Sequence, residues 1–342
     1  MQDIISTLGE FTSKNNIFPN EIIKEHTTMK IGGRVKAFVT PYSVDELVNV
    51  IKVFRDNNER FMLTGNASNL LFSDDDLDFY VVSTDCRGAV SLGISGEDKS
   101  GVKADENALN GVTLSEALFE ELENIDLKLD TENKAYTFIK ANAGAYLSNV
   151  ASVAANHSLK GFEGLSGIPG TIGGAVVMNA GAYGAEVKDV IVAAKVLTGD
   201  GEIKLLNKEE LKLSYRNSVI LEAGYIVLTG YFALEKGDKE EITALMKELN
   251  FKRRDKQPLE YPSCGSTFKR PEGAFAAKLI EDSGLKGYRV GDMMISDKHA
   301  GFMINAGNGT FKDAIKVMED VKEKVKADSG FVLEPEVKII KG

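Results

Sequence analysis

Cysteine and histidine are scarce in this sequence. Its 342 residues include two cysteines, Cys86 and Cys264, and three histidines. Two cysteines cannot build a disulfide framework, and the cysteines and histidines do not have the spacing of a metal site. The sequence therefore predicts neither a disulfide-stabilised scaffold nor a metal centre.

Long apolar runs are absent as well. No stretch of 18 or more apolar residues occurs, so the sequence predicts no membrane-spanning helix. Residues 1–10 lack the cationic start and the apolar centre of a secretory signal peptide. We therefore expect the protein to be cytoplasmic.

Positive charge is also in short supply. The 41 lysines and arginines are outnumbered by 51 aspartates and glutamates, which gives a net charge of −10. Such a chain offers no basic surface for nucleic acid or an anionic membrane, so neither is expected as a partner. The hydrophobic content of 43% is typical of a globular protein, and 342 residues suggest two or three domains.

Much of the negative charge lies in residues 95–135. This segment holds 11 acidic residues against 4 lysines. Thr113 and Glu116 have the spacing of a capping box and predict a helix that begins there. We interpret the segment as a solvated helical insertion on a sheet edge, with a partner-binding surface as the less common alternative.

Glycine, in contrast, is concentrated in residues 161–184, where it fills eight of 24 positions. The bare N–H groups of a glycine-rich turn form a concave nest that fits a pyrophosphate, which predicts a bound cofactor. The stretch is not a Walker A loop, because no glycine precedes Lys-Ser or Lys-Thr. It is not a Rossmann fingerprint either, because no hydrophobic strand precedes it. A loop-rich connection in an ordinary sheet remains the alternative.

A second candidate nest is Gly65-Asn-Ala-Ser-Asn69, which directly follows a short apolar strand at residues 61–64. Asparagine and serine supply side-chain hydrogen-bond donors, and asparagine tolerates the left-handed backbone that such a turn requires. A plain strand-to-strand turn is the equally weighted alternative.

The hydrophobic pattern predicts both helices and strands. Apolar residues recur at helical spacing in several segments and alternate or cluster at strand spacing in others. The expected helices are at residues 44–57, 146–157, 242–256, 274–283 and 313–326, and the expected strands are at 35–39, 61–64, 136–141, 190–197, 202–206, 225–234 and 298–305.

The segment from residue 257 to 271 is the second place where we expect chemistry. It carries Cys264 and Ser266 after two prolines. The G-x-S-x-G elbow is absent, so a Ser/His/Asp hydrolase is not predicted. Cys264 is either a nucleophile or, more commonly, a buried structural thiol. Near the end of the chain, Pro335 interrupts an apolar strand and draws attention to Glu336.

Together these motifs resemble the UDP-N-acetylenolpyruvoylglucosamine reductase family, of its second, shorter type. Eight motifs occur in the family's order and approximate spacing over nearly the whole chain apart from the acidic segment. They are His26-Thr-Thr-Met-Lys-Ile-Gly-Gly, Gly65-Asn-Ala-Ser-Asn-Leu, Gly167-Ile-Pro-Gly-Thr-Ile-Gly-Gly-Ala, Asn179-Ala-Gly-Ala-Tyr-Gly, Tyr215-Arg-Asn-Ser, Tyr261-Pro-Ser-Cys-Gly-Ser-Thr-Phe, Lys298-His-Ala-Gly-Phe and Leu333-Glu-Pro-Glu-Val.

The resemblance implies an FAD-binding fold of the vanillyl-alcohol-oxidase type, in which two α+β subdomains enclose the flavin and a third α+β domain binds substrate. The expected boundaries are residues 1–80 with 330–342, residues 81–254, and residues 255–329. The implied reaction is NADPH-dependent reduction of the enolpyruvyl group of a UDP-sugar during peptidoglycan precursor synthesis, by a monomer with non-covalent FAD.

The resemblance also implies roles for individual residues. Arg216 and Glu336 would stabilise the charge that develops on the substrate, and Ser266 would donate the proton. Tyr215 and Lys256 would contact the substrate. The FAD loops would comprise Gly65, Asn66, Ala67, Ser68, Asn69, Gly167, Ile168, Pro169, Gly170, Gly173 and Gly174.

Two features depart from the family pattern. Position 67 is alanine where the family commonly has glycine, so this loop must accommodate a Cβ atom, and the acidic segment has no counterpart that we recognise. Two other functions stay open: an FAD-dependent sugar or alcohol oxidase on the same fold, and a catalytically silent UDP-sugar-binding protein. Neither histidine nor cysteine lies in or beside residues 65–69, which argues against a covalently linked flavin oxidase.

Overall fold

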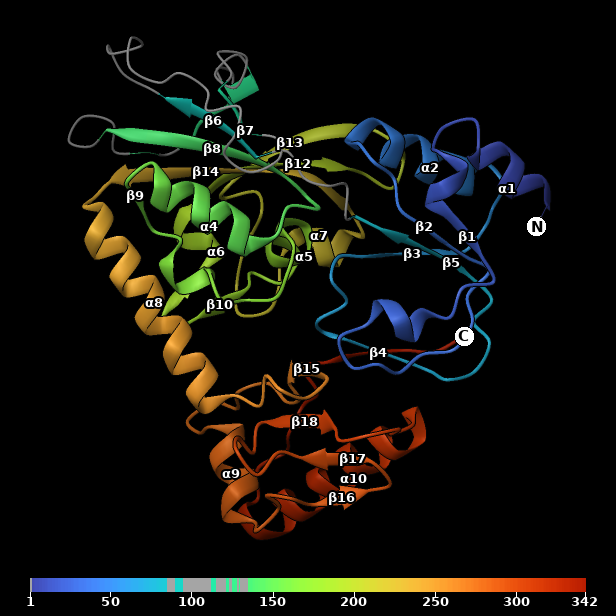
Figure 1. Ribbon diagram of the computed structural model, residues 1–342, viewed down its shortest axis with the longest axis vertical. Coiled ribbons are helices and arrows are strands. Elements are labelled where there is room, and N and C mark those ends of the chain that lie inside the picture. Colours follow the sequence, from blue (N-terminus) through green and yellow to red (C-terminus); the bar gives the residue numbers. More distant parts are fainter. Residues whose placement is uncertain are drawn as a thin grey trace.

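The structure is a computed structural model that describes residues 2–84, 90–94, 112–114, 121–122, 125–127, 129 and 135–342. Three layered units are visible in it (Figure 1). Cys86 and most of the acidic segment lie outside the described residues. Within them, every helix is too short or too polar to cross a lipid bilayer.

The first unit is a four-stranded sheet with the order β1-β2-β5-β3 (Ile17–Pro19, Ala37–Val39, Tyr80–Ser83 and Phe61–Thr64). Helix α2 (Val44–Asp56) packs on it through five buried apolar residues, and its cap Ser43 accepts a hydrogen bond from the Glu46 N–H. The predicted helix at residues 44–57 is therefore confirmed. Helix α1 (Gln2–Leu8) and the 3-10 turns η1 (Lys14–Asn16) and η2 (Ile23–His26) complete the unit.

The C-terminus returns to this first unit. Strand β19 (Lys338–Ile340) pairs in parallel with β4 (Leu70–Phe72), with Lys338 opposite Leu70. The predicted strand near the end of the chain is thus shorter than expected. Pro335 has no N–H to donate and makes only an isolated bridge with Phe268.

The second unit is a larger sheet with the order β13-β12-β14-β8-β6-β7, and β9 also pairs with β14. Its strands are β6 (Val90–Ile94), β7 (Val112–Leu114), β8 (Tyr136–Asn142), β9 (Leu159–Lys160), β12 (Ile191–Leu197), β13 (Ile203–Asn207) and β14 (Ile226–Lys236). The predicted strands at residues 190–197 and 202–206 are confirmed as β12 and β13, which pair with each other as an antiparallel hairpin.

Short helices cover one face of this sheet (Figure 1). They are α4 (Leu147–Asn156), α5 (Ile172–Val177), α6 (Val187–Val190) and α7 (Val219–Ala223), with the turn η3 (Glu163–Leu165) and the small hairpin of β10 (Gly181–Ala182) and β11 (Ala185–Glu186) beside them. Because strand residues alternate between faces, Ile139 faces this helical core while Phe138 faces the opposite side.

The capping-box prediction at Thr113 is wrong. Val112–Leu114 forms strand β7, which pairs in parallel with β6, so no helix begins at Thr113. The β-branched side chains of Val112 and Thr113 favour a strand. Glu121 and Leu122 are helical, and Leu122 packs with Ile125 on the sheet face opposite the helices.

The third unit follows the long helix α8 (Lys239–Lys256), whose N-terminus Asp238 caps. Its sheet has the order β15-β18-β17-β16 (Ser263–Ser266, Phe302–Asn305, Met293–Ile295 and Arg289–Val290). Helices α9 (Ala276–Asp282) and α10 (Phe311–Ser329) pack against it, and Thr310 with Asp313 forms the capping box of α10. Met29 and Leu71 of the first unit pack into its core, so the two units are in direct apolar contact.

Candidate active site

The two loops that were predicted as pyrophosphate nests lie against each other, and we call them the first and second glycine-rich loops. The first, residues 65–69, follows strand β3, and the second, residues 167–174, leads into helix α5. The Asn66 side-chain amide donates a hydrogen bond to the Pro169 carbonyl at 2.8 Å. A Cβ atom on Gly65 would lie 2.2 Å from Thr171 Oγ1, so no larger residue fits at this position without displacing the second loop. The structure thus brings together two segments that are about a hundred residues apart.

The junction of these loops fits a polar ligand. Thr171 Oγ1 is buried and has no hydrogen-bond partner within the described part of the chain. A buried polar atom of this kind normally has a partner. Gly174 is exposed next to it, with Thr171 Oγ1 as its nearest neighbour, at 3.8 Å from an added Cβ. The hydroxyl and the adjacent bare backbone fit a bound phosphate group.

Ala67 occupies a left-handed conformation with φ +47° and is buried. Its Cβ atom is accommodated within the apolar cluster that contains Phe72 and Val81. The alanine at this position therefore faces the interior of the first unit and does not disrupt the loop.

Two of the predicted loop glycines have packing roles. The Gly173 N–H donates to the Ala143 carbonyl at 2.8 Å, and an added Cβ would lie 3.0 Å from the Ala143 Cβ. An added Cβ on Gly167 would lie 2.5 Å from Asn250 Oδ1 and 3.2 Å from Arg253 Cδ. Gly167 thus allows α8 to approach the loop, and the Gly173 N–H is already used within the protein. Ile168 packs on the helical core.

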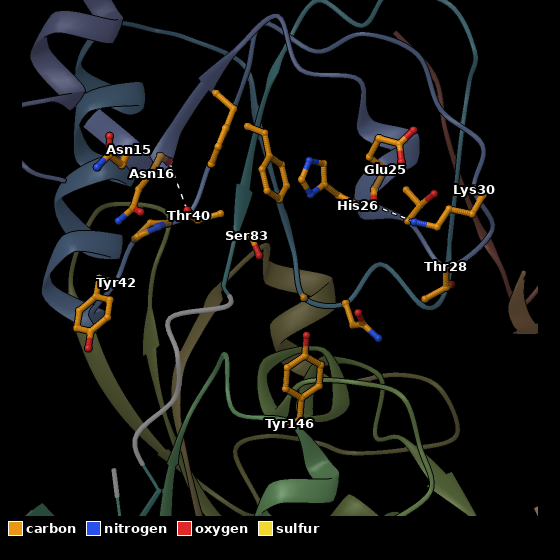
Figure 2. Close-up of a pocket in the computed structure, with 16 residues that line it drawn as sticks. Asn15, Asn16, Glu25, His26, Thr28, Lys30, Thr40, Tyr42, Ser83 and Tyr146 are labelled. Carbon is orange, nitrogen blue, oxygen red and sulfur yellow. Dashed lines mark hydrogen bonds between the residues drawn. The ribbon is translucent and has the colours of Figure 1, made fainter. Parts of the chain in front are cut away.

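A pocket of about 650 Å³ opens beside Gly65 and Asn66. Figure 2 shows side chains from several segments around it, with Tyr146 at the start of α4 and Tyr42 before α2. The His26 ring stacks on Phe38, with 3.9 Å between ring centroids, and its Nε2 lies 2.9 Å from Glu21 Oε1.

Sequence reasoning assigned no role to these pocket residues. The only sequence signal was the His26-Thr-Thr motif, which supported the resemblance without indicating a function. Tyr42 and Tyr146 gave no signal, because they come to line one pocket only after the first and second units have packed together.

Arg216 and Glu336 form an ion pair across 120 positions of sequence. Arg216 Nε donates to Glu336 Oε1 at 2.6 Å, and their side chains are 19% and 11% exposed. Arg216 has a left-handed backbone, with φ +56°. The guanidinium also lies over the Tyr215 ring, 5.1 Å from its centroid. A pair so far from solvent forms a strong, charge-assisted hydrogen bond.

Ser266 lies on the neighbouring segment. It is the last residue of β15, and the carbonyl of the next residue, Thr267, accepts a hydrogen bond from the Glu336 N–H at 2.9 Å. The Asn69 amide donates to the Glu336 carbonyl at 3.3 Å. The first glycine-rich loop, Ser266 and Glu336 are therefore linked through consecutive hydrogen bonds. The Ser266 hydroxyl has no hydrogen-bond partner among the residues that the structure describes.

The two expected substrate-binding residues differ in their surroundings. The Tyr215 hydroxyl accepts a hydrogen bond from the Arg270 N–H at 3.2 Å, which connects the second unit to the third. Lys256 is the exposed last residue of α8, and in the described structure it forms no ion pair and makes no hydrogen bond to the other predicted site residues. Arg216, Tyr215 and Glu336 are therefore in direct contact with one another through Arg216, whereas Lys256 makes no hydrogen bond or ion pair to any of these three described residues.

Cys264 is a buried structural thiol. Its side chain donates to the Leu70 carbonyl at 2.9 Å, and burial raises the pKa of the thiol to about 12. A thiol with such a pKa is protonated at neutral pH and is a poor nucleophile. Of the two alternatives for Cys264, the structural one is correct.

Family comparisons agree with this arrangement. Residues 257–340 match the C-terminal domain of UDP-N-acetylenolpyruvoylglucosamine reductase, and residues 94–207 match an FAD binding domain. The second match includes the acidic segment. The prediction of FAD as cofactor and of a vanillyl-alcohol-oxidase-type fold with a third domain is confirmed.

Individual proteins are similar over nearly the whole chain. UDP-N-acetylenolpyruvoylglucosamine reductase of Lachnoclostridium phytofermentans is 44% identical, covering 98% of this chain and 97% of its own. The protein of the same name from Caldanaerobacter subterraneus is 42% identical, covering 98% of each chain. The crystal structure of the Thermus caldophilus reductase has a TM-score of 0.68 at 31% identity and covers 94% of this chain and 97% of that one. The chain belongs to the UDP-N-acetylenolpyruvoylglucosamine reductase family.

Proposed function

We propose that this protein reduces the enolpyruvyl group of UDP-N-acetylglucosamine enolpyruvate to give UDP-N-acetylmuramate, a peptidoglycan precursor. NADPH is the hydride source, and FAD is bound without a covalent link. The observation that carries the proposal is the ion pair of Arg216 and Glu336, held within one hydrogen-bonded network with the strand of Ser266 and the first glycine-rich loop.

FAD, when bound, supplies hydride transfer from NADPH to the terminal vinyl carbon of the substrate. The residues that fit its pyrophosphate lie at the loop junction. The two loops that would enclose it comprise Gly65, Asn66, Ala67, Ser68 and Asn69 on one side and Gly167, Ile168, Pro169, Gly170, Gly173 and Gly174 on the other. On the second side Gly167, Ile168 and Gly173 pack within the protein, so Pro169, Gly170, Gly174 and the neighbouring Thr171 hydroxyl would face the pyrophosphate.

Hydride addition to the vinyl carbon leaves negative charge on the adjacent carbon and its carboxylate. The Arg216 guanidinium is fixed by Glu336 and so requires little reorganisation when this charge develops. Ser266 donates a proton to the adjacent carbon, which completes the addition of one hydride and one proton across the double bond, and it regains a proton from solvent. A serine hydroxyl is a weak acid but adequate for a strongly basic carbanion within hydrogen-bond distance.

Substrate contacts and organisation complete the proposal. Tyr215 and Lys256 contact the UDP-sugar, and the lysine suits its diphosphate. The FAD subdomains comprise residues 1–80 with 330–342 and residues 81–254, and residues 255–329 form the substrate domain. The return of β19 to β4 supports joining the two ends of the chain in one subdomain. The protein acts as a monomer in the cytoplasm, on two small molecules.

An anaerobic half-reaction experiment tests the function. The flavin is reduced with NADPH, excess NADPH is removed, the enolpyruvyl substrate is added, and flavin absorbance is followed. Rapid return of the oxidised spectrum in the wild type, lost in Ser266→Ala, is the expected result. If the flavin stays reduced until oxygen is admitted, the protein is an oxidase. If the purified protein carries no flavin and takes up none, the silent UDP-sugar-binding alternative holds.

A further inference from the structure

The loop that follows η2 is fastened to the strand that carries Ser266. Thr28 Oγ1 donates to the Ser263 carbonyl at 2.7 Å, and the Ser263 N–H donates back to the Thr28 carbonyl at 3.1 Å. Ser263 is the first residue of β15 and Ser266 is the last. One residue of the first unit thus forms both hydrogen bonds at the start of this strand.

A second attachment lies one residue further along the loop. The Asn305 amide donates to the Met29 carbonyl at 3.2 Å, and the Asn305 N–H donates to the Pro262 carbonyl at 2.9 Å. Met29 is 1% exposed within the core of the third unit. The loop is therefore held on the β15–β18 pair at two adjacent residues, Thr28 and Met29. The Met29 attachment keeps Thr28 in place beside Ser263.

Strand β15 depends on such outside support because its own pairing is sparse. Its register with β18 pairs Ser263 with Ile304 and Ser266 with Phe302, and it shifts between the two pairs. Gly265 has φ +74° at this irregularity. A bulge redirects the side chain that follows it. The direction of the Ser266 side chain thus depends on where the strand starts, and Thr28 sets that position.

The same loop lines the pocket beside the first glycine-rich loop. Thr28 and Lys30 are labelled at its edge in Figure 2, together with His26. Thr28 Oγ1 is also 3.5 Å from the Ala67 carbonyl. This contact is long, so the hydroxyl proton goes to the Ser263 carbonyl, and the hydroxyl sits between the FAD loop and β15.

We propose that Thr28 is a positioning residue that aligns Ser266 for proton transfer. It holds the start of β15 at a fixed distance from the glycine-rich loop of residues 65–69, and it does not touch the substrate. This inference rests on the proposed function, because it assumes that Ser266 is the proton donor. It predicts that removing the hydroxyl slows the step that uses Ser266 and spares the step that does not.

The experiment separates the two half-reactions. Thr28→Val keeps the branched shape and removes the hydroxyl, whereas Thr28→Ser keeps the hydroxyl. In anaerobic stopped-flow mixing, we expect Thr28→Val to bind flavin with an unaltered spectrum and to be reduced by NADPH at the wild-type rate. Reoxidation by the enolpyruvyl substrate should be about tenfold slower, because small misplacements of a reacting group cost one to two powers of ten in rate. Thr28→Ser should restore the rate.

Two further variants serve as a substitute and as a control. Thr28→Ala should show the same selective loss and replaces Thr28→Val if that protein does not fold. Ser152→Ala removes another hydroxyl, whose hydrogen bond to the Ser148 carbonyl at 2.8 Å lies within helix α4 and does not reach β15. It should leave both half-reactions unchanged.

Three results would overturn the inference. Reoxidation of Thr28→Val at the wild-type rate would show that the hydroxyl does not position Ser266. Equal slowing of both half-reactions would assign Thr28 to the flavin pocket or to folding in general. A wild-type flavin that the substrate fails to reoxidise would refute the proposed function itself, which the first two results would leave intact.

Discussion

Replacing Glu121 with glutamine should strongly destabilise the protein. Glu121 lies within the acidic segment, over the sheet face opposite the helices. Its carboxylate accepts hydrogen bonds from Lys140 Nζ at 2.8 and 2.9 Å, from Lys195 Nζ at 3.1 Å and from the Tyr231 hydroxyl at 2.6 Å. The Glu121 side chain is 30% exposed, so solvent screens these interactions only in part.

The size of the effect follows from the pKa of Glu121. Burial favours the neutral acid, but the hydrogen bonds from Lys140, Tyr231 and Lys195 outweigh it and lower the pKa from 4.5 to about 2. At 1.36 kcal/mol per pKa unit, this shift corresponds to about 3 kcal/mol of stability at neutral pH. Because the folded-state pKa is the lower one, the contribution is complete above the unfolded pKa of 4.5 and declines as the pH falls toward about 2.

Urea unfolding of the FAD-loaded protein at a fixed FAD concentration measures this contribution. At pH 7, Glu121→Gln should lower the free energy of unfolding by about 2–3 kcal/mol, because two lysines lose their partner. The difference from wild type should shrink below about pH 4.5. Glu202→Gln is the control, because Glu202 pairs with Lys204 while 61% exposed, and it should change stability by less than about 1 kcal/mol.

The reasoning would be refuted if Glu121→Gln changed stability no more than Glu202→Gln at pH 7. It would also be refuted if the difference from wild type were the same at pH 7 and pH 3. Either result would mean that the carboxylate is not held in its charged form by the lysines.

Three other predictions concern the site. Arg216→Lys and Glu336→Gln should each lower kcat about a hundredfold while FAD stays bound, because the first replaces the planar guanidinium and the second removes the carboxylate that fixes it in place. Steady-state kinetics that match wild type would contradict this. Gly65→Ala should lose FAD, because the new Cβ would lie 2.2 Å from Thr171 Oγ1, and a purified variant with full flavin absorbance would refute the clash. Cys264→Ala should keep kcat but lose about 1–2 kcal/mol of stability in thermal unfolding, and a large fall in kcat would restore the nucleophile alternative.

Strong local patterns were enough to predict much of the fold. Helix α2 combines an apolar stripe with the cap Ser43, and α10 combines one with the capping box of Thr310, so both were predicted to within three residues at each end. The hairpin of β12 and β13 has a tight turn between two apolar runs and was also correct. Where the local sequence pattern and the tertiary packing favour the same element, the sequence alone is sufficient to predict that element.

The errors arose where local hydrogen bonds or tertiary pairing override the pattern. The strand expected from residue 298 begins only at Phe302, because Ser296 Oγ accepts hydrogen bonds from the Lys298 and His299 N–H groups and holds a turn there. Residues 112–114 pair with β6, a partner that the sequence did not reveal. The six-residue helix α5 is too short to produce a recognisable apolar period.

The candidate site was predictable in its parts but not in its assembly. Glycine density pointed to the second loop, the Asn and Ser residues after a short strand pointed to the first, and the family motifs pointed to Arg216, Ser266 and Glu336. No local pattern shows that Asn66 reaches the Pro169 carbonyl or that Gly167 and Gly173 serve packing. The packing of Gly167 depends on where α8 lies, and that of Gly173 depends on Ala143 at the end of β8. Both are properties of the assembled fold.

The position of Glu336 is set by a strand register. Lys338 pairs with Leu70, and the Lys338 N–H donates to the Asn69 carbonyl at 2.9 Å, so Glu336 lies two residues before the pairing starts. A slip of one residue would move its side chain by about 3.3 Å and turn it to the other face of the strand. The β4–β19 pair therefore fixes the carboxylate relative to the loop of residues 65–69.

Arg216 pairs with Glu336 from a different unit, on a left-handed backbone, and Ser266 belongs to the third unit, next to Thr267, whose carbonyl accepts the Glu336 N–H. Each of the three units thus contributes one group, and each group is positioned by backbone hydrogen bonds or ion pairs to its neighbours. A reaction that adds hydride to one carbon and a proton to the next needs both donors at fixed places. The short parallel pairing at the C-terminus and the Thr28 attachment meet that requirement without a large interface at the reacting groups.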